Sequence, residues 1–461
     1  MRLSVFLFLS LTAALWGESR PEQILIFTNV NVIDVRDGEI YRNMTVVIQD
    51  GRVASVAHIG LIGTGKNLQV VNANGRYLIP GLWDMHAHTV GRSALWDERV
   101  LYPQYIANGV TGLREVGGDP DLLEQRTREI DSGRLLGPHL VSYDVASNTQ
   151  PHQPEGRGAV EAVKKRGMDF VRALSGLSRD ALLASSNAGS PKLTFAGDYP
   201  DSVSVMDAPM VGEKSIEHLA GVQLACSSKE PELRKQRLEA LADHDLAAYS
   251  SATMQVMNTY DPQKAQKLYL ELAAHATWQV PALVWTQALA SMDSPKIAAD
   301  PRLLFVPASI RSDWDPQTLL AGTVPGQLAP AKRQAYEQLQ VVGAMHRTGV
   351  QFLAGTDGPD PFVFPGFSLH DELELLVKSG FSPLEALQTA TFNPGLFMAK
   401  LDKYGVIEKG HIADLVLLDD NPVMNIRNTR KIYAVVVGGH YYSRQDLDHM
   451  LARVQELAAK E

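Results

Sequence analysis

Two histidines one residue apart, His86 and His88, stand in the stretch LIPGLWDMHAHT at the end of an apolar run. Residues two apart in a β-strand point to the same side, so both imidazoles can face one metal ion. Neutral imidazole and carboxylate groups are suitable ligands for zinc and related divalent ions. An HxH pair alone is weak evidence for a metal site, so other parts of the chain must supply the remaining ligands.

Two later stretches supply candidates for those ligands. KSIEHL contains His218 and FLAGTD ends in Asp357, and each has a strand-like character. Glu217, next to His218, is expected to point to the opposite face of its strand and to have a structural role. His370, at the start of the segment LHDELELL, and Trp285 are expected to pack in the core.

The elements that must position these residues alternate along the chain. Short apolar runs are followed by helical stretches, one of which, LHDELELLVKSG, has Gly380 as its expected stop. Repeated strand-then-helix units imply a parallel sheet and an α/β class. About eight such units over residues 78–401 favour a (β/α)8 TIM-like barrel, in which active residues lie at the carboxyl ends of the strands.

Both ends of the chain are rich in β-branched residues. Near the N-terminus, two strand-like runs flank an Asp50-Gly51 step, which is a hairpin signal. We expect residues 20–77 and 402–442 to form one small β-sandwich domain beside the barrel. The last residues, 443–461, have the spacing of an amphipathic helix.

The first residues, MRLSVFLFLSLTAALWGES, combine an early arginine, an apolar run and small residues. This layout is typical of a secretory signal peptide, which we place at residues 1–19. The apolar run falls short of the roughly 20 residues that a membrane span needs. The expectation is therefore a secreted or periplasmic protein with no stable membrane insertion after signal removal.

Composition narrows the class of partner. The chain has 461 residues, 45% of them hydrophobic, and a formal net charge of -9, which argues against nucleic acid or an anionic membrane as the main partner. Small molecules or short peptides are the expected partners, and a homo-oligomer is compatible with the sequence. Cys226 is the only cysteine, so no intrachain disulfide can form, and we expect it to fill apolar space.

Taken together, these motifs resemble those of the amidohydrolase superfamily. The chain is most similar to its imidazolonepropionase-like branch, which includes exported dipeptidase-like members. The resemblance covers nearly all of the chain after the expected signal and runs through LIPGLWDMHAHT, YIANGVTGLREVGG, GMDFVRAL, KLTFAGDYP, KSIEHLAG, FLAGTDGP and YGVIEKGHIADLVLLDDNP. It implies a barrel with an appended β-sandwich and metal-dependent hydrolysis of amide-like bonds.

Four positions match the site that this resemblance implies. His86 and His88 match the strand-one pair, and His218 matches the strand-six histidine of the family. Asp357 matches the strand-eight aspartate, which is a metal ligand and proton shuttle in the family. The resemblance therefore implies that these four residues form the metal site.

Two positions depart from the family pattern. The phrase DFVR places Arg172 where the branch has a lysine, usually carbamylated to bridge two metals, and AGDYP places Asp198 where the branch has a histidine. Arginine stays protonated and offers only donors, so it cannot be carbamylated and does not ligate a cation. The second metal thus loses its bridge and one of its histidines, and we expect one metal.

Two arrangements of the altered positions remain open. Arg172 and Asp198 can form a bidentate ion pair where the second metal lies in the family. Alternatively, Asp198 joins the HxH pair and Asp357 as a metal ligand, and His218 then hydrogen-bonds the substrate oxygen. Arg172 would then serve as a donor to substrate or transition-state charge.

The expected reaction is hydrolysis of an amide-like C–N bond in a dipeptide, an N-acyl amino acid or a cyclic amide. Asp357 would take the proton of the attacking water, and His218 or Arg172 would stabilise the oxyanion. The expected cofactor is one zinc, although manganese, iron or nickel also suit these ligands. The alternatives are a non-catalytic protein of this fold that has lost its metal centre, and an enzyme of similar machinery that acts on a lactone or ester.

Overall fold

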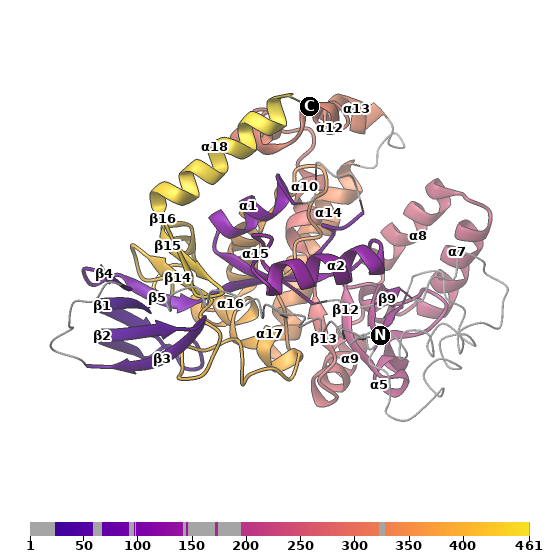
Figure 1. The fold of residues 1–461 in the computed structure, drawn as a ribbon. Helices are drawn as coiled ribbons and strands as arrows, with labels where there is room; N and C mark the ends of the chain where they lie inside the picture. The colour runs from indigo at the N-terminus through magenta and orange to yellow at the C-terminus, as the bar shows by residue number, and fades with distance from the viewer. Residues whose placement is uncertain are drawn as a thin grey trace, which may run out of the picture.

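The structure is a computed structural model that describes residues 24–58, 67–91, 96, 98–141, 144–145, 171–173, 195–321 and 328–460. It contains sheets and helices of the α/β class (Figure 1). The expected signal peptide at residues 1–19 lies outside the described residues. Within the described ranges, no helix combines the length and the apolar character needed to cross a membrane.

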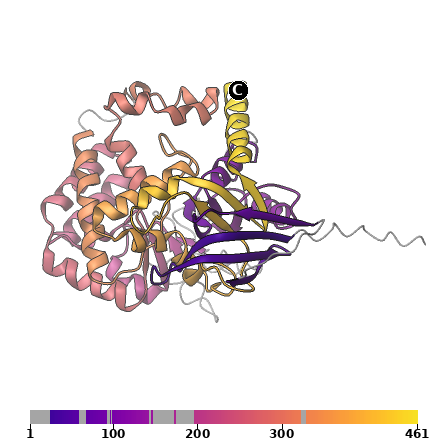
Figure 2. The ribbon, with the colours of Figure 1, turned by 90° about the vertical axis from the view of Figure 1, so that its left-hand side faces the viewer.

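One sheet of eight strands joins the two ends of the chain, and we call it the terminal sheet. Its strands are β1 (Ile24–Ile33), β2 (Ile40–Gln49), β3 (Arg52–Ala57), β4 (Leu68–Asn72), β5 (Tyr77–Pro80), β14 (Leu415–Leu418), β15 (Ile432–Val437) and β16 (His440–Ser443). Their order is β16-β15-β14-β5-β1-β2-β3, and β4 pairs with β1. Apolar side chains from both ends of the chain, including Phe27 and Leu415, form a core within it. Figure 2 shows this sheet to one side of the helical body.

The turn between β2 and β3 confirms the hairpin expected at Asp50-Gly51. The two strands pair antiparallel, with Gln49 opposite Arg52. The φ angles are 53° at Asp50 and 71° at Gly51. Two successive positive φ values are what a tight hairpin turn requires, and Asp-Gly supplies them at low steric cost.

The middle of the chain forms parallel strands. They are β6 (Leu82–Ala87), β7 (Val110–Glu115), β8 (His139–Val141), β9 (Asp144–Val145), β10 (Val171–Ala173), β11 (Phe195–Gly197), β12 (Glu213–Glu217) and β13 (Trp278–Val280). One sheet has the order β6-β7-β8 and the other β13-β12-β11-β10-β9, and every pairing is parallel. The chain passes from the terminal sheet to these strands at Gly81, three residues beyond the expected start at residue 78, because Leu78 pairs with Leu417 of β14.

The segment 351–358 lies between the two parallel sheets. Leu353 N donates to Gln279 O of β13 at 2.9 Å, and Asp357 N donates to His86 O of β6 at 2.8 Å. It forms isolated bridges to both neighbours but not the regular strand expected for FLAGTD. Gly355 explains the close approach, because a Cβ there would lie 2.7 Å from that of His86.

The helices of the described residues pack against the strands of both parts of the molecule and against one another. They are α1 (Leu101–Ala107), α2 (Pro120–Asp131), α5 (Ala208–Val211), α6 (Val222–Ala225), α7 (Glu230–Ala242), α8 (Leu246–Asn258), α9 (Pro262–Ala274), α10 (Leu283–Ala290), α11 (Pro295–Ala298), α12 (Ala308–Arg311), α13 (Pro316–Ala321), α14 (Leu328–Arg347), α15 (Phe367–Ser379), α16 (Pro383–Thr389), α17 (Phe392–Phe397) and α18 (Arg444–Lys460), with short 3-10 turns at Val205–Asp207, Pro301–Phe305 and Ile426–Arg430. The helix α18 confirms the expected C-terminal helix.

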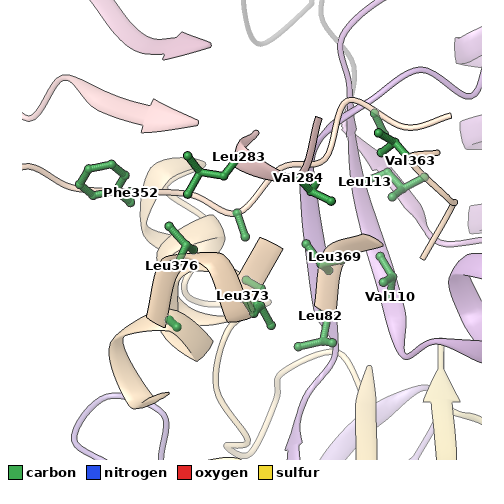
Figure 3. Packing of buried hydrophobic residues seen from close by; sticks show 14 of the residues in the cluster. Leu82, Val110, Leu113, Leu283, Val284, Phe352, Val363, Leu369, Leu373 and Leu376 are labelled. Atoms are coloured by element: carbon green, nitrogen blue, oxygen red, sulfur yellow. The ribbon is translucent and has the colours of Figure 1, made fainter. Parts of the chain in front are cut away.

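Packing of α15 illustrates how a helix is fixed to the strands. Leu369, Leu373 and Leu376 recur at the spacing of one helix face, and they share a buried apolar cluster with Leu82 of β6 (Figure 3). The helix ends at the expected stop, Gly380, whose φ of 114° is a conformation that favours glycine. Burial of each leucine contributes roughly 1.5–3 kcal/mol, which holds α15 against β6 and β7.

Candidate metal site

Four side chains converge beyond the carboxyl ends of the parallel strands. Asp357 Oδ1 lies 2.9 Å from His88 Nε2 and 3.2 Å from His86 Nε2, and Asp357 Oδ2 lies 3.5 Å from His218 Nε2. Ligand atoms of His86, His218 and Asp357 all lie within 4.8 Å of one another. The structure thus brings together the four residues that the sequence singles out at HAH, SIEH and GTD.

Local backbone conformation aims two of these residues at the cluster. His86 is the fifth residue of β6, whereas His218 follows the last residue of β12 and Asp357 lies near the end of segment 351–358. His218 and Asp357 have φ values of 55° and 65°, in the left-handed region that few non-glycine residues adopt. Such conformations persist where surrounding contacts fix them, and they concentrate at functional sites.

His86 is held by a residue whose role the sequence reasoning missed. Its Nδ1 lies 2.7 Å from Glu217 Oε2, and both side chains are buried. The expectation that Glu217 points away from the site is wrong, because His218 lies beyond the end of β12 and strand alternation does not extend to it. The pattern Glu213-x-Ser215-x-Glu217, polar at alternate positions of a buried strand, was the available signal.

Glu217 is itself anchored by buried donors. Its Oε1 accepts from Arg114 Nη2 at 2.6 Å and from Ser215 Oγ at 2.8 Å. Burial alone would raise the pKa of Glu217, but the positive charge of Arg114 and the hydrogen bond with His86 outweigh it and lower the pKa to about 2. Glu217 is therefore ionised at neutral pH.

Two more buried carboxyl groups hold the backbone beside the cluster. Glu115 Oε2 accepts from Thr89 N at 2.8 Å and Thr89 Oγ1 at 2.7 Å, directly after His88. Asp84 accepts from Thr356 N at 3.0 Å and Thr356 Oγ1 at 2.6 Å, directly before Asp357. Supporting contacts of this kind orient ligands and are needed for a well-formed metal site.

The electrostatics of the cluster favour a positive charge between its carboxylates. Burial by itself lowers the pKa of His86, but the charges of Asp357 and Glu217 outweigh it and raise the pKa to about 9. Burial likewise opposes ionisation of Asp357, yet the neighbouring histidines hold its pKa far below the usual range. Burial and the charge of His86 lower the pKa of His218. A proton or a divalent cation would satisfy this arrangement.

The donor set fits a divalent metal. His86 Nε2 is buried and has no hydrogen-bond partner among the described residues, although it faces Asp357. Its Nδ1 is engaged by a carboxylate, which is the usual support for a metal-ligating histidine. Three imidazoles and one carboxylate suit zinc and the related ions.

The two altered positions lie on neighbouring strands. β10 and β11 run parallel, with Arg172 opposite Ala196, and Asp198 directly follows β11. Only the backbone of Arg172 is among the described parts of the chain, so the expected Arg172–Asp198 ion pair stays a prediction. Asp198 is half-buried, and its negative charge acts on His218. Asp198 is not in the tightest group of ligand atoms.

Trp285 packs against the main apolar core, as expected, and it also lies beside the histidine cluster. It is half-buried in α10, its ring centre is 5.5 Å from that of His218, and its Nε1 donates to Asp360 Oδ2 at 2.6 Å. The expectation for His370 is confirmed: it is buried, with Nδ1 2.9 Å from Thr429 Oγ1. The ring of Trp285 thus lies next to the imidazole of His218.

A separate cavity of about 670 Å³ lies between α10, α11 and α15. Val284 and Ala288 of α10 line it together with Asp371 and Glu374 of α15, and none of the histidine cluster does. Among its charged groups, Arg302 contacts Asp371 and Arg427 contacts Glu374. The cavity therefore has no part in the site.

The chain is similar in sequence to proteins of the amidohydrolase family and to a curated relative. A model of the amidohydrolase family matches residues 306–441, a stretch that includes Asp357, β14 and β15. Ochratoxinase from Aspergillus niger is 22% identical over 423 residues, which cover 85% of this chain and 80% of the relative.

Solved structures agree on the fold. A bottromycin amidohydrolase superposes with a TM-score of 0.72 at 20% identity, covering 96% of this chain and 92% of the other. An Xaa-Pro dipeptidase with bound methionine superposes with a TM-score of 0.62 at 17% identity, covering 91% of this chain and 100% of the other. These likenesses show that the chain shares its overall fold with both proteins.

Proposed function

The chain belongs to the amidohydrolase superfamily, and from this premise we propose that it is a metal-dependent hydrolase that uses water to cleave an amide-like C–N bond. The observation that carries the proposal is the convergence of three imidazoles on Asp357, where the buried His86 Nε2 has no hydrogen bond among the described residues and faces Asp357 Oδ1 at 3.2 Å. A buried group of this kind is costly unless it binds something.

We propose one divalent metal, with zinc as the first candidate and manganese, iron or nickel as the others. His86, His88 and Asp357 would hold it, with His218 or Asp198 completing the set. Arg172 stands where the family bridge to a second metal would lie, and a guanidinium cannot ligate a cation. When bound, such an ion makes water nucleophilic near neutral pH and polarises a carbonyl oxygen.

The chain's own residues would then move the proton. Asp357 is ionised and lies at the centre of the cluster, so it can accept the proton of the attacking water and return it to the leaving nitrogen. The lowered pKa of His218 keeps its imidazole neutral, and in this form it can ligate the metal or donate one hydrogen bond to the developing oxyanion.

For the substrate we propose a dipeptide, an N-acyl amino acid or a cyclic amide. The dipeptide class is supported by the structural likeness to an Xaa-Pro dipeptidase. Trp285 borders His218 with a half-buried aromatic face and can pack against an apolar substrate group.

We further propose that the parallel strands form one closed (β/α)8 barrel and that the terminal sheet forms a β-sandwich beside it. Backbone hydrogen bonds from segment 351–358 to β13 and β6 support closure on one side.

The N-terminal sequence supports a proposal of export to the periplasm or the cell exterior. A protein expressed in its native host from the full chain should begin after residue 19 when its N-terminus is sequenced. An intact N-terminus on protein recovered from the cell interior would contradict export.

Elemental analysis tests the proposed function. The protein is expressed from the full chain, purified without an affinity tag and assayed against Xaa-Pro dipeptides, N-acyl amino acids, cyclic amides and matched esters. We expect about one metal per chain, lost in Asp357→Asn, and hydrolysis of at least one amide. Two metals would contradict the interpretation of Arg172. No metal after reconstitution with several divalent ions would contradict the proposal and favour a non-catalytic binding protein.

A further inference from the structure

A chain of buried polar contacts leads from β7 through β12 to the histidine cluster. Arg114 Nη2 lies 2.6 Å from Glu217 Oε1, and Glu217 Oε2 lies 2.7 Å from His86 Nδ1. All three side chains are at most 1% exposed. We propose that Arg114 and Glu217 are a positioning pair that fixes His86 in the tautomer able to bind metal. This inference rests on the proposed function.

The tautomer follows from hydrogen-bond chemistry. An ionised carboxylate is only an acceptor, so the contact of Glu217 Oε2 with His86 Nδ1 places a hydrogen on Nδ1. In the neutral ring the lone pair is then on Nε2, the atom that faces Asp357. Glu217 therefore selects the nitrogen that is offered to the metal.

Arg114 determines how Glu217 can be oriented. Its guanidinium donates to Met85 O at 2.6 Å, to Ser215 Oγ at 2.9 Å and to Glu217 Oε1 at 2.6 Å. Ser215 Oγ donates to the same Oε1 at 2.8 Å, so one oxygen of Glu217 is fully engaged by donors. Only Oε2 remains to accept from His86, and rotation of the carboxylate would break both contacts of Oε1.

Glu213 provides a matched control within the same strand. It lies four residues before Glu217 in β12 and is also buried. Neither of its carboxylate oxygens has a hydrogen-bond partner among the described residues. A change at Glu213 therefore tests the effect of removing a buried carboxyl group from β12 without touching His86.

The decisive variant is Glu217→Gln. Arg114 and Ser215 require an acceptor, so the amide oxygen takes the place of Oε1 and the amide NH2 faces His86 Nδ1. Nδ1 must then accept, which moves the ring hydrogen to Nε2 and blocks the metal-binding lone pair. We expect the dissociation constant for Zn²⁺ to rise about 10- to 100-fold, as for other lost supports of a ligating histidine. Glu213→Gln should leave it unchanged.

Metal affinity is measured by competition with a chromogenic chelator, and the visible absorption of the Co²⁺-loaded protein reports the ligand set. In Glu217→Gln the Co²⁺ bands should change, whereas thermal unfolding should show a folded protein. Arg114→Lys keeps the charge but loses the planar array of donors, so we expect an intermediate loss of affinity. If Glu217→Gln does not fold, the Zn²⁺ affinity of Arg114→Lys tests the proposed positioning role instead.

The outcomes separate this inference from the proposed function. Wild-type protein that binds no metal overturns the proposed function and the inference with it. Wild-type protein that binds metal, with Glu217→Gln binding as tightly and giving the same Co²⁺ spectrum, overturns only the inference. Equal loss of affinity in Glu213→Gln and Glu217→Gln also overturns it, because the effect would then be general to buried carboxyls of β12.

Discussion

The two ends of the candidate site differ in how their side chains are held. At the end built from β6, β7, β12 and segment 351–358, which we call the held end, Asp84, Glu115 and Glu217 are buried, and each accepts hydrogen bonds at or next to a candidate metal ligand. At the end built from β10 and β11, the strands have three residues each, and Asp198 is only half-buried.

This difference indicates which part of the site is constrained by chemistry. A ligand held by a buried carboxyl cannot move without leaving that carboxyl unpaired, which costs about 1–3 kcal/mol or more. The residues matching the family lie at the held end, and both departures, Arg172 and Asp198, lie at the other. We infer that the held end supplies the metal chemistry and that the other end can vary.

The largest effect should come from the centre of the held end. Asp357→Asn removes both a metal ligand and the group that accepts and returns the proton, so we expect kcat to fall by at least about 10²- to 10⁴-fold. Steady-state kinetics on a substrate found in the panel measure the change. Asp360→Asn, three residues away, is the control and should lose far less. Comparable losses in the two variants would mean that the loop as a whole is required and not the proton transfer.

The second effect tests the other end by a double-mutant cycle. If Arg172 and Asp198 form an ion pair, Arg172→Met and Asp198→Asn should each lower the free energy of unfolding by about 1–3 kcal/mol, and the double variant should lose much less than either single variant because it leaves no unpaired charge. Denaturant unfolding measures the three values. A double variant no better than the worse single one would reject the pair. Loss of metal in Asp198→Asn alone would then support Asp198 as a ligand.

The third effect is a pH dependence of the free energy of unfolding, which we expect from Glu115 at the held end. Burial outweighs the hydrogen bonds from Thr89 and raises the pKa of Glu115 from 4.5 to about 8. The folded protein therefore binds this proton more tightly than the unfolded chain, and the stability it contributes below pH 4.5 is lost as the pH rises to about 8.

Glu115→Gln removes this titration. Its free energy of unfolding relative to wild type should rise by roughly 2–4 kcal/mol between about pH 5 and pH 9, as measured by urea unfolding at both values. Glu217 gives the opposite sign, because its pKa is lowered to about 2 and its contribution is lost as the pH falls toward that value. A Glu115→Gln difference independent of pH would show that Glu115 is ionised in the folded protein.

Much of the held end could be predicted because its ligands follow strand-like runs. The HxH spacing, His218 and Asp357 are each visible in a short motif, and the strand-then-helix alternation places those motifs at one edge. Glu217 was assigned to the wrong face because alternation was carried one residue past the end of β12, where His218 takes a φ of 55°.

The remaining errors concern long-range contacts. Arg114 appears in the sequence only as a charged residue in an apolar strand, and its partner Glu217 is 103 residues away. Trp285 packs against the core as its aromatic character predicts, but no local pattern indicates that it also lies beside His218. Segment 351–358 reads as a strand, but Gly355 and the positive φ of Asp357 interrupt its regular pairing.

The smallest effect concerns the space where the two ends meet. Trp285→Phe keeps an aromatic ring near His218 but removes the hydrogen bond of 2.6 Å to Asp360. A single hydrogen bond contributes about 0.5–1.5 kcal/mol, so we expect KM to rise several-fold with little change in kcat. Steady-state kinetics separate the two parameters. A fall in kcat with KM unchanged would instead place Trp285 among the groups that act in the transition state, and the boundary between the held and the variable end would have to move to include α10.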